Sequence, residues 1–214
     1  NYWIVHGIFK TKNTLKSVCH QIKQFLSKAP KEIIIFDFHS FEEGFAKDLD
    51  KNVLKQHFQG FFHIVTSYLN DYLIPYSLGY NVTIDKLIQM NKRVLVGFER
   101  KSSKVLESDL LWPNVKHQWQ NKDDIKDLEN SFDNDLCKDK SLTLKSAMAE
   151  LTPEINKVIK DEYGGLRKMA DQVNHKFDEW FAHRWRNCVN IIAADYFLGS
   201  NLVDISIDIN KNVK

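Results

Sequence analysis

Three short apolar runs set the strongest limit on how this chain can fold. They are EIIIFDF at residues 32–38, RVLVGF at 93–98 and CVNIIAADYF at 188–197. Continuous runs of this length, rich in β-branched residues, are typical of strands that are buried on both faces of a parallel sheet. We therefore predict that all three segments are parallel strands.

The sequence between these runs carries helical patterns, in which apolar residues recur every three or four positions. The first pattern ends before Pro30, and Thr83 is a suitable N-cap for a short helix that follows it. The resulting order of strands and helices predicts an α/β fold. Helices are expected at residues 14–29, 49–73 and 83–90, and more helix is expected over 152–185, interrupted by the pair Gly164-Gly165.

Additional strands bring the expected total to about six. They are the opening segment that ends at His6, a segment near Val115, and part of residues 142–151. A closed (β/α) barrel has eight strands, so in a barrel the opening strand would be the third, with two strands upstream of Asn1. We predict an incomplete TIM-like (β/α) barrel that forms a single domain over residues 1–214. The charged segment 122–140 is expected to be a solvated helix and loop.

Composition excludes several classes of protein. The formal net charge is +2, from 30 Lys and Arg against 28 Asp and Glu, so no global field attracts nucleic acid. No apolar run approaches the roughly 20 residues that a membrane span needs. The chain is expected to be soluble or peripheral to a membrane, and the compartment, cytoplasmic or secreted, stays open.

The cysteines predict neither a disulfide framework nor a metal site. Cys19, Cys137 and Cys188 are few and scattered, and no cysteine or histidine cluster has the spacing of a zinc site. The triplet that begins at Asn81 and ends at Thr83 is an N-glycosylation sequon. This motif has meaning only if the protein is secreted.

Three polar residues end predicted strands and are candidates for function: His6, His39 and Asp195. In an α/β barrel the carboxyl ends of the strands carry the chemistry. The alternative for each histidine is a ring whose nitrogen atoms are satisfied by the backbone. A carboxylate at Asp195 is costly unless it is paired or faces solvent.

The chain resembles the later part of the phosphatidylinositol-specific phospholipase C X-domain-containing proteins. The resemblance extends from end to end, and the order and spacing of several phrases carry it. The phrases are YWIVHG, QIKQFLSKAPKEIIIFDFHSF, LWPNVKHQW, AELTP, GGLRKMADQVNHKFDEWF and NIIAADYFLGSNLVDISIDIN.

The resemblance implies a distorted TIM barrel that uses two histidines in general acid–base catalysis. The second family histidine lies in a strand-ending His-Gly, which here is His6-Gly7. It implies that His6 protonates the leaving diacylglycerol oxygen and then activates water against a cyclic inositol phosphate. Asp195 matches an acidic residue that holds the first family histidine by a hydrogen bond.

The first family histidine, in a Gly-Ser-His segment, and a phosphate-binding arginine are expected upstream of Asn1. The resemblance thus implies that these 214 residues hold half of the catalytic site. The chain alone is expected to be inactive, and the full-length protein is expected to be an enzyme. The missing N-terminal segment, or a second chain, is expected to complete the barrel.

The site is predicted to need no metal and no other cofactor. Calcium-dependent relatives place a glutamate ligand on the strand that matches residues 32–38, and His39 or its neighbour matches that position. Phe38 and Ser40 offer no carboxylate, whereas calcium prefers several oxygen ligands. Asp37 is the other acidic candidate, and strand alternation is predicted to point it away from the side of His39.

Substrate binding is assigned to His39, Arg100 and Tyr196. Arg100 either binds a phosphate through its forked donors or faces water. Tyr196 either stacks on an inositol ring or packs against the protein. Two functions follow: cleavage of a phosphatidylinositol-like lipid at a membrane surface or, alternatively, binding of an inositol phosphate or lipid without cleavage. Residues upstream of Asn1 would discriminate between the two.

Overall fold

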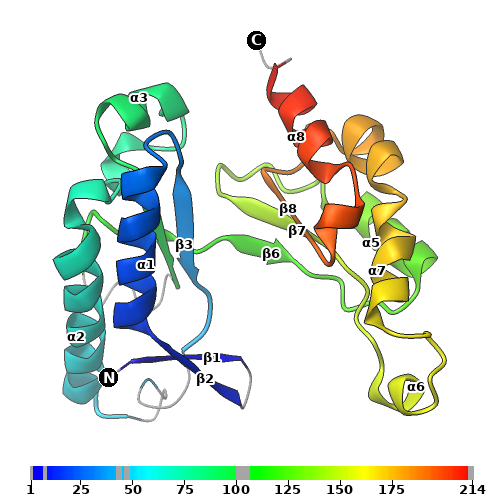
Figure 1. The fold of residues 1–214 in the computed structure, drawn as a ribbon, viewed down its shortest axis with the longest axis horizontal. Helices are drawn as coiled ribbons and strands as arrows, with labels where there is room; N and C mark the ends of the chain where they lie inside the picture. The colour runs from blue at the N-terminus through cyan, green and yellow to red at the C-terminus, as the bar shows by residue number, and fades with distance from the viewer. Residues whose placement is uncertain (1, 7–8, 42–44, 46–48, 100–106, 212–214) are drawn as a thin grey trace. The chain divides into compact units, whose positions relative to one another are not determined.

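The computed structural model describes residues 2–6, 9–41, 45, 49–99 and 107–211 (Figure 1). Contacts divide the chain into two compact units, Asn1–Val115 and Lys116–Lys214. Each unit has a hydrophobic core of its own. No described helix is long and apolar enough to cross a bilayer.

The first unit combines an antiparallel hairpin with a three-stranded parallel sheet. The sheet order is β3-β4-β5, and α1 packs beside α2 (Figure 1). The elements are β1 (Trp3–His6), β2 (Phe9–Thr14), α1 (Leu15–Lys28), β3 (Ile34–Phe38), α2 (Lys51–Leu69), α3 (Ile84–Gln89), β4 (Val94–Phe98) and β5 (Trp112–Pro113).

Local sequence signals account for where the helices of the first unit begin. The Thr14 side chain accepts a hydrogen bond from the Ser17 amide at 3.1 Å, and the Ser17 hydroxyl oxygen accepts one from the Thr14 amide. These two bonds satisfy amides that the first turn of α1 leaves without partners. The predicted N-cap of α3 is confirmed, because Thr83 accepts from the Lys86 amide.

Aromatic rings dominate the core of the first unit. Phe58 and Phe61 of α2 pack on Phe98 of β4 with ring centroids 5.6 and 5.8 Å apart. All five residues of β4 are buried, as the continuous apolar run predicted. Burial of these side chains contributes about 1.5–3 kcal/mol each.

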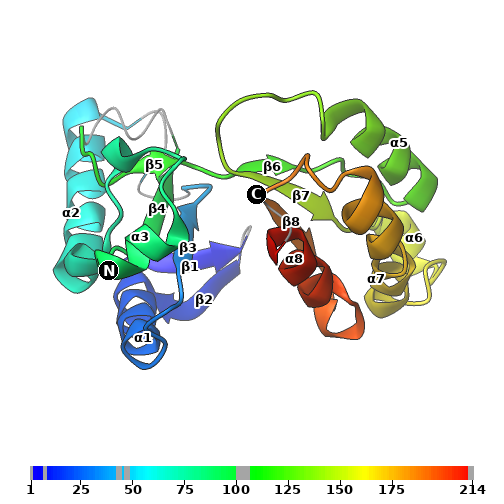
Figure 2. The same cartoon turned by 90° about the horizontal axis from the view of Figure 1, so that it is seen from above.

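The second unit is a parallel sheet packed against helices (Figure 2). Strand β7 lies between β6 and β8, and Trp180 and Trp185 contribute the largest rings of the core. The elements are β6 (Lys116–Gln118), α5 (Ile125–Asp135), β7 (Lys145–Ala149), α6 (Ile155–Ile159), α7 (Leu166–Asn174), a π-helix (Asp178–Arg184), β8 (Ile191–Ala194), a 3-10 turn (Phe197–Gly199) and α8 (Leu202–Lys211).

The predicted TIM-like barrel is wrong. Among the described residues the strands form one two-stranded and two three-stranded sheets, and these sheets do not close into a barrel. The opening strand fails as a barrel strand because β1 pairs antiparallel with β2. Only two residues separate His6 from Phe9, and a parallel neighbour needs a crossover of a dozen or more residues. The parallel α/β pattern itself is present in both three-stranded sheets.

Two expectations for the segment 122–140 and the cysteines are also wrong. Leu128 and Phe132 on α5 are fully buried, so this helix is a core element with one charged face. Leu128, Phe132 and Leu136 recur every four residues and form one apolar face, which the many charged residues between them made hard to recognise in the sequence. Cys137, just beyond α5, forms a disulfide with Cys188, which precedes β8. The two cysteines lie 51 residues apart, so spacing gave no sign of the pairing.

Candidate functional site

In the first unit, Asp37 and His39 lie together at the carboxyl end of β3. Asp37 Oδ1 accepts a hydrogen bond from the Val115 amide at 2.9 Å, and Asp37 Oδ2 lies 3.6 Å from His39 Nδ1. Asn114 Nδ2 is 3.5 Å from the same ring nitrogen. The His39 side chain is 49% exposed and that of Asp37 is 15% exposed. An imidazole that is accessible and lies beside a carboxylate is suited to proton transfer.

The predicted orientation of Asp37 is therefore wrong. Residues two positions apart in a strand share a face, because the side-chain period of a strand is two. Asp37 and His39 fulfil this rule, and the contact between them follows from it.

A glycine on the neighbouring strand makes room for Asp37. Gly97 of β4 is the Cα partner of Asp37. A Cβ atom added at Gly97 would lie 2.1 Å from Asp37 Oδ1, far inside van der Waals contact. The absent side chain lets the carboxylate lie over β4 and bind the Val115 amide beyond β5.

Two predicted site residues have side chains outside the described part of the structure. The backbone of His6 ends β1, and the side chain is outside that part. Arg100 lies wholly outside the described residues. The acid role of His6 and the phosphate role of Arg100 stay predictions.

In the second unit, Asp195 and Tyr196 directly follow β8 and project from an ordered turn. Both are exposed, and Tyr196 has a left-handed backbone with φ of 50°. The buried Asn174 of α7 donates from Nδ2 to the Asp195 carbonyl at 3.1 Å and to the Tyr196 carbonyl at 3.4 Å. A left-handed backbone is uncommon for a residue other than glycine, and it persists only where surrounding contacts stabilise it. The hydrogen bonds from Asn174 are such contacts, because they fix both carbonyl groups of the turn.

The ring of Tyr196 lies at the surface of the second unit, and its role in substrate binding stays a prediction. Its side chain stays 49% exposed, and the guanidinium of Arg167 lies 5.1 Å from the centre of its ring. Arg167 also contacts Asp171, with Nε 3.5 Å from Oδ1. The ring thus forms a cation–π contact at the surface and is not packed into the core.

Sequence reasoning missed Glu150, which follows β7. Strands β7 and β8 are parallel neighbours, and Ala149 pairs with Ala194, so Glu150 and Asp195 occupy the next positions of the two strands. Burial raises the pKa of Glu150, and the negative charge of Asp195 raises it further. Carboxyl groups with raised pKa values are frequent in functional sites. The signal was available, because Glu150 is an acidic residue at the end of a predicted strand, as Asp195 is.

The structure therefore assembles two local groups. His39 joins Asp37 in the first unit, and Asp195 and Tyr196 join Glu150, Asn174 and Arg167 in the second. The prediction that His6, His39 and Asp195, which were expected to end strands, serve one site involves residues of both units and stays a prediction. The carboxylate oxygens of Glu150 and Asp195, the carboxyl pair, are suited to accept hydrogen bonds from the hydroxyl groups of a polyol.

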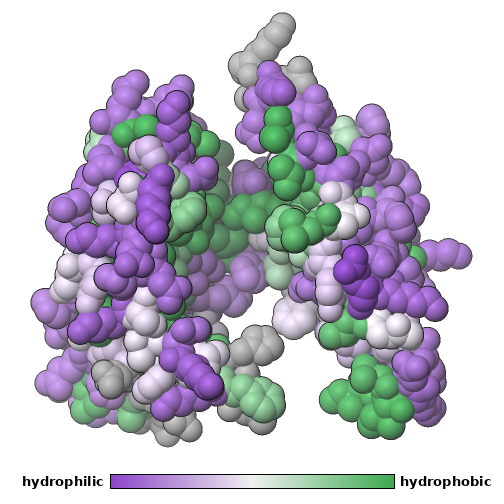
Figure 3. Space-filling view, viewed as in Figure 1, coloured by the Kyte–Doolittle hydropathy of each residue, from purple (hydrophilic) through white to green (hydrophobic). Residues whose placement is uncertain are grey.

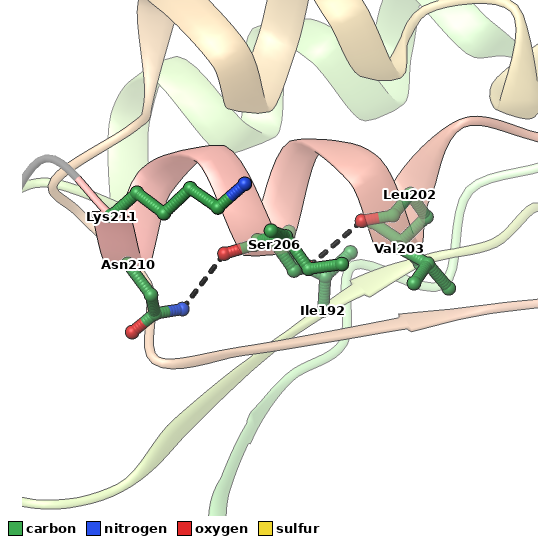
Figure 4. A pocket seen from close by; sticks show the side chains of 7 residues that line it. Ile192, Leu202, Val203, Ser206, Asn210 and Lys211 are labelled. Atoms are coloured by element: carbon green, nitrogen blue, oxygen red, sulfur yellow. Dashed lines mark hydrogen bonds between the residues drawn. The ribbon is translucent and has the colours of Figure 1, made fainter.

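A separate pocket lies along α8 in the second unit (Figure 4). Its lining is mainly apolar, with Ile192, Leu202 and Val203 on its wall. The hydroxyl of Ser206 donates to the Leu202 carbonyl and Asn210 Nδ2 donates to the Ser206 carbonyl, each at 2.8 Å, so these polar groups are occupied within the helix (Figure 4). None of the predicted site residues lines this pocket.

No family model, curated protein or solved structure matches this chain. The family resemblance therefore stays a prediction from the phrases of the sequence. The assignment of a site depends on the strand ends described above.

Proposed function

We propose that this chain is part of a phosphodiesterase of the phospholipase C type that acts on phosphatidylinositol-like lipids. The observation that carries the proposal is the carboxyl pair of Glu150 and Asp195 at the ends of two adjacent parallel strands. Asp195 is the residue that the family resemblance assigned on separate grounds. In open α/β sheets ligands bind at the carboxyl ends of the strands.

The proposed reaction is phosphoryl transfer in two steps with histidine as the proton carrier. An inositol hydroxyl attacks the phosphorus, and the bond to the diacylglycerol oxygen breaks as His6 donates a proton to that oxygen. Water, deprotonated by His6, then attacks the phosphorus of the cyclic inositol phosphate, and the inositol oxygen that leaves takes back the proton that the other histidine removed in the first step. A positioned proton transfer of this kind contributes about 10²–10⁴-fold to the rate.

The other residues bind and orient the substrate in this proposal. The Asp195 carboxylate accepts a hydrogen bond from the histidine that removes the proton of the inositol hydroxyl, and that histidine comes from a Gly-Ser-His segment that the 214 residues do not contain. Arg100 binds the phosphate in this proposal, and His39 of the first unit and Tyr196 of the second unit keep their predicted roles in substrate binding. Neither step requires a metal ion.

The test is release of water-soluble inositol phosphate from labelled phosphatidylinositol vesicles in the presence of EDTA. The protein with any natural sequence that precedes Asn1 is compared with residues 1–214 alone. His6→Ala is expected to lower turnover by about 10²–10⁴-fold. Asp195→Asn is expected to reduce turnover, whereas Asp204→Asn, at an exposed carboxylate of α8, is the matched control and should retain full activity.

Full turnover by His6→Ala would disprove its acid role, and a requirement for added calcium would disprove the metal-free site. If the longer protein cleaves no phosphoinositide and still sediments with vesicles, it is a binding module, provided that Asp195→Asn weakens sedimentation and Asp204→Asn does not.

A further inference from the structure

We infer that Asn81 carries an N-linked glycan and that the protein matures in an oxidising compartment where such glycans are attached. Asn81, Val82 and Thr83 form the one Asn-X-Ser/Thr triplet in the 214 residues. The inference concerns a modification site, and it is independent of the proposed phosphodiesterase activity.

The turn that contains Asn81 has room for a bulky modification. Asn81 and Thr83 are both exposed. Gly79, two residues earlier, has φ of 68°, and a Cβ atom built on it meets no described atom within 4 Å. Thr83 Oγ1 accepts from the Lys86 amide at 3.3 Å, which leaves the hydroxyl hydrogen available as a donor. A glycan at this position would extend into solvent without displacing core residues.

The turn is also held firmly, so the attachment point is fixed on the surface of the first unit. Asp109 accepts from the Ser77 amide at 2.9 Å and from the Ser77 hydroxyl at 2.6 Å. The ring of Tyr80 lies 5.0 Å from that of the buried Trp112, centre to centre. The polar triplet thus follows an anchored segment and precedes the first turn of α3.

The disulfide between Cys137 and Cys188 is a second and independent observation. Structural disulfides persist in secreted and extracellular proteins, in the lumen of the endoplasmic reticulum and in the bacterial periplasm, and they are rare in the cytosol. N-linked glycans are attached to secreted proteins. The bond lies in the second unit, far from the sequon in the sequence. Both features indicate that the protein matures in an oxidising compartment.

The third cysteine does not contradict an oxidising compartment. An unpaired cysteine in a secreted protein commonly forms intermolecular disulfides when its thiol is reachable. Cys19 is fully buried in the core of the first unit, and burial raises the pKa of its thiol to about 12. A buried thiol of this kind is inert, because the thiolate is the reactive form.

The decisive experiment is a peptide map of the protein purified from its natural source. Trypsin releases Asn81 in the peptide of residues 56–86. We expect this peptide to appear without a glycan only after treatment with peptide N-glycosidase, and then with Asn81 converted to aspartate. We also expect Cys137 and Cys188 to be recovered as one linked pair of peptides. Recovery of unmodified residues 56–86 before treatment, or of free thiols at Cys137 and Cys188, would overturn the inference.

Matched variants locate the glycan. In cells that secrete the protein, Asn81→Gln should lose the shift in electrophoretic mobility that the glycosidase removes from the unsubstituted protein. Asn156→Gln, at an exposed asparagine outside any sequon, should keep that shift. Thr83→Ser should also keep it, because serine preserves both the acceptor motif and the helix cap. A shift that persists in Asn81→Gln would overturn the assignment of the site.

Discussion

At the scale of single residues, Glu150 is the member of the carboxyl pair whose pKa is shifted by its surroundings. Burial and the charge of Asp195 both disfavour its ionised form and raise its pKa. The folded chain therefore binds the proton of Glu150 more tightly than the unfolded chain does. The resulting stabilisation is complete below the ordinary pKa of glutamate and is lost as the pH rises through the raised pKa.

We predict that Glu150→Gln stabilises the protein at about pH 8 and has little effect at about pH 4, where both side chains are neutral. The measurement is the free energy of unfolding in urea at several pH values. Asp195→Asn should produce part of the same effect, since it removes the repulsion and leaves the burial. Glu162→Gln, at an exposed position, is the control. If the curves of the Glu150→Gln and unsubstituted proteins ran parallel across this range, the environment assigned to Glu150 would be wrong.

At the scale of elements, the Asp37 side chain links three neighbouring strands of the first unit. It starts on β3, passes over Gly97 of β4 and binds the Val115 amide just beyond β5. The link depends on the missing side chain at Gly97. It also keeps the other carboxylate oxygen beside the His39 ring, so the same glycine supports the candidate site.

We predict that Gly97→Ala destabilises the protein by about 1–3 kcal/mol, because the new methyl group forces Asp37 away from the Val115 amide. Urea unfolding measures the change. In an Asp37→Ala background, Gly97→Ala should change the free energy of unfolding only slightly. The difference between the two backgrounds measures the interaction between position 97 and Asp37. Gly199→Ala, whose added Cβ would lie 3.4 Å from Arg167 Nη2, is the control. Equal stability of Gly97→Ala and Gly199→Ala would refute the proposed link.

At the scale of the whole molecule, the chain has two cores that differ in how they are stabilised. The first depends on packed phenylalanine rings, and the second contains Trp180, Trp185 and a disulfide. The disulfide joins the end of α5 to the residues before β8, so it encloses α6, α7 and the π-helix. In α6, Ile155 and Ile159 are each 77% exposed, and Figure 3 shows apolar surface over this helix. Because little of α6 is buried, packing of this helix stabilises the second unit only weakly. We therefore expect the disulfide to contribute a larger part of the stability of that unit.

We predict that Cys137→Ser with Cys188→Ser destabilises the second unit by about 2–4 kcal/mol and leaves the first unit largely unchanged. Hydrogen exchange resolved by peptide is the measurement. Amides of α5 and α7 should lose protection by more than tenfold relative to the intact protein, while those of α1 and β4 should not. Cys19→Ala serves as the converse variant, since it removes a buried side chain of the first core. Equal loss of protection in both units after removal of the disulfide would contradict the prediction.

The sequence by itself determined the local elements and their order. The run of residues 93–98 predicted a buried strand, and β4 is buried throughout, because a strand covered on both faces needs apolar residues at every position. Thr83 and Pro30 marked helix ends correctly, since capping and the loss of an amide act within a few residues. Asp195 was identified as a strand-end carboxylate for the same local reason.

Tertiary structure alone decided how these elements pair and which side chains meet. The barrel prediction failed because strand count and order do not fix pairing, and the two-residue connection between β1 and β2 favours an antiparallel hairpin. The contact between Asp37 and Val115 joins residues 78 positions apart, and the disulfide joins residues 51 apart. The raised pKa of Glu150 likewise depends on Asp195 of the adjacent strand. Such contacts depend on which distant segments become neighbours, and patterns within a short window of sequence carry no information about that choice.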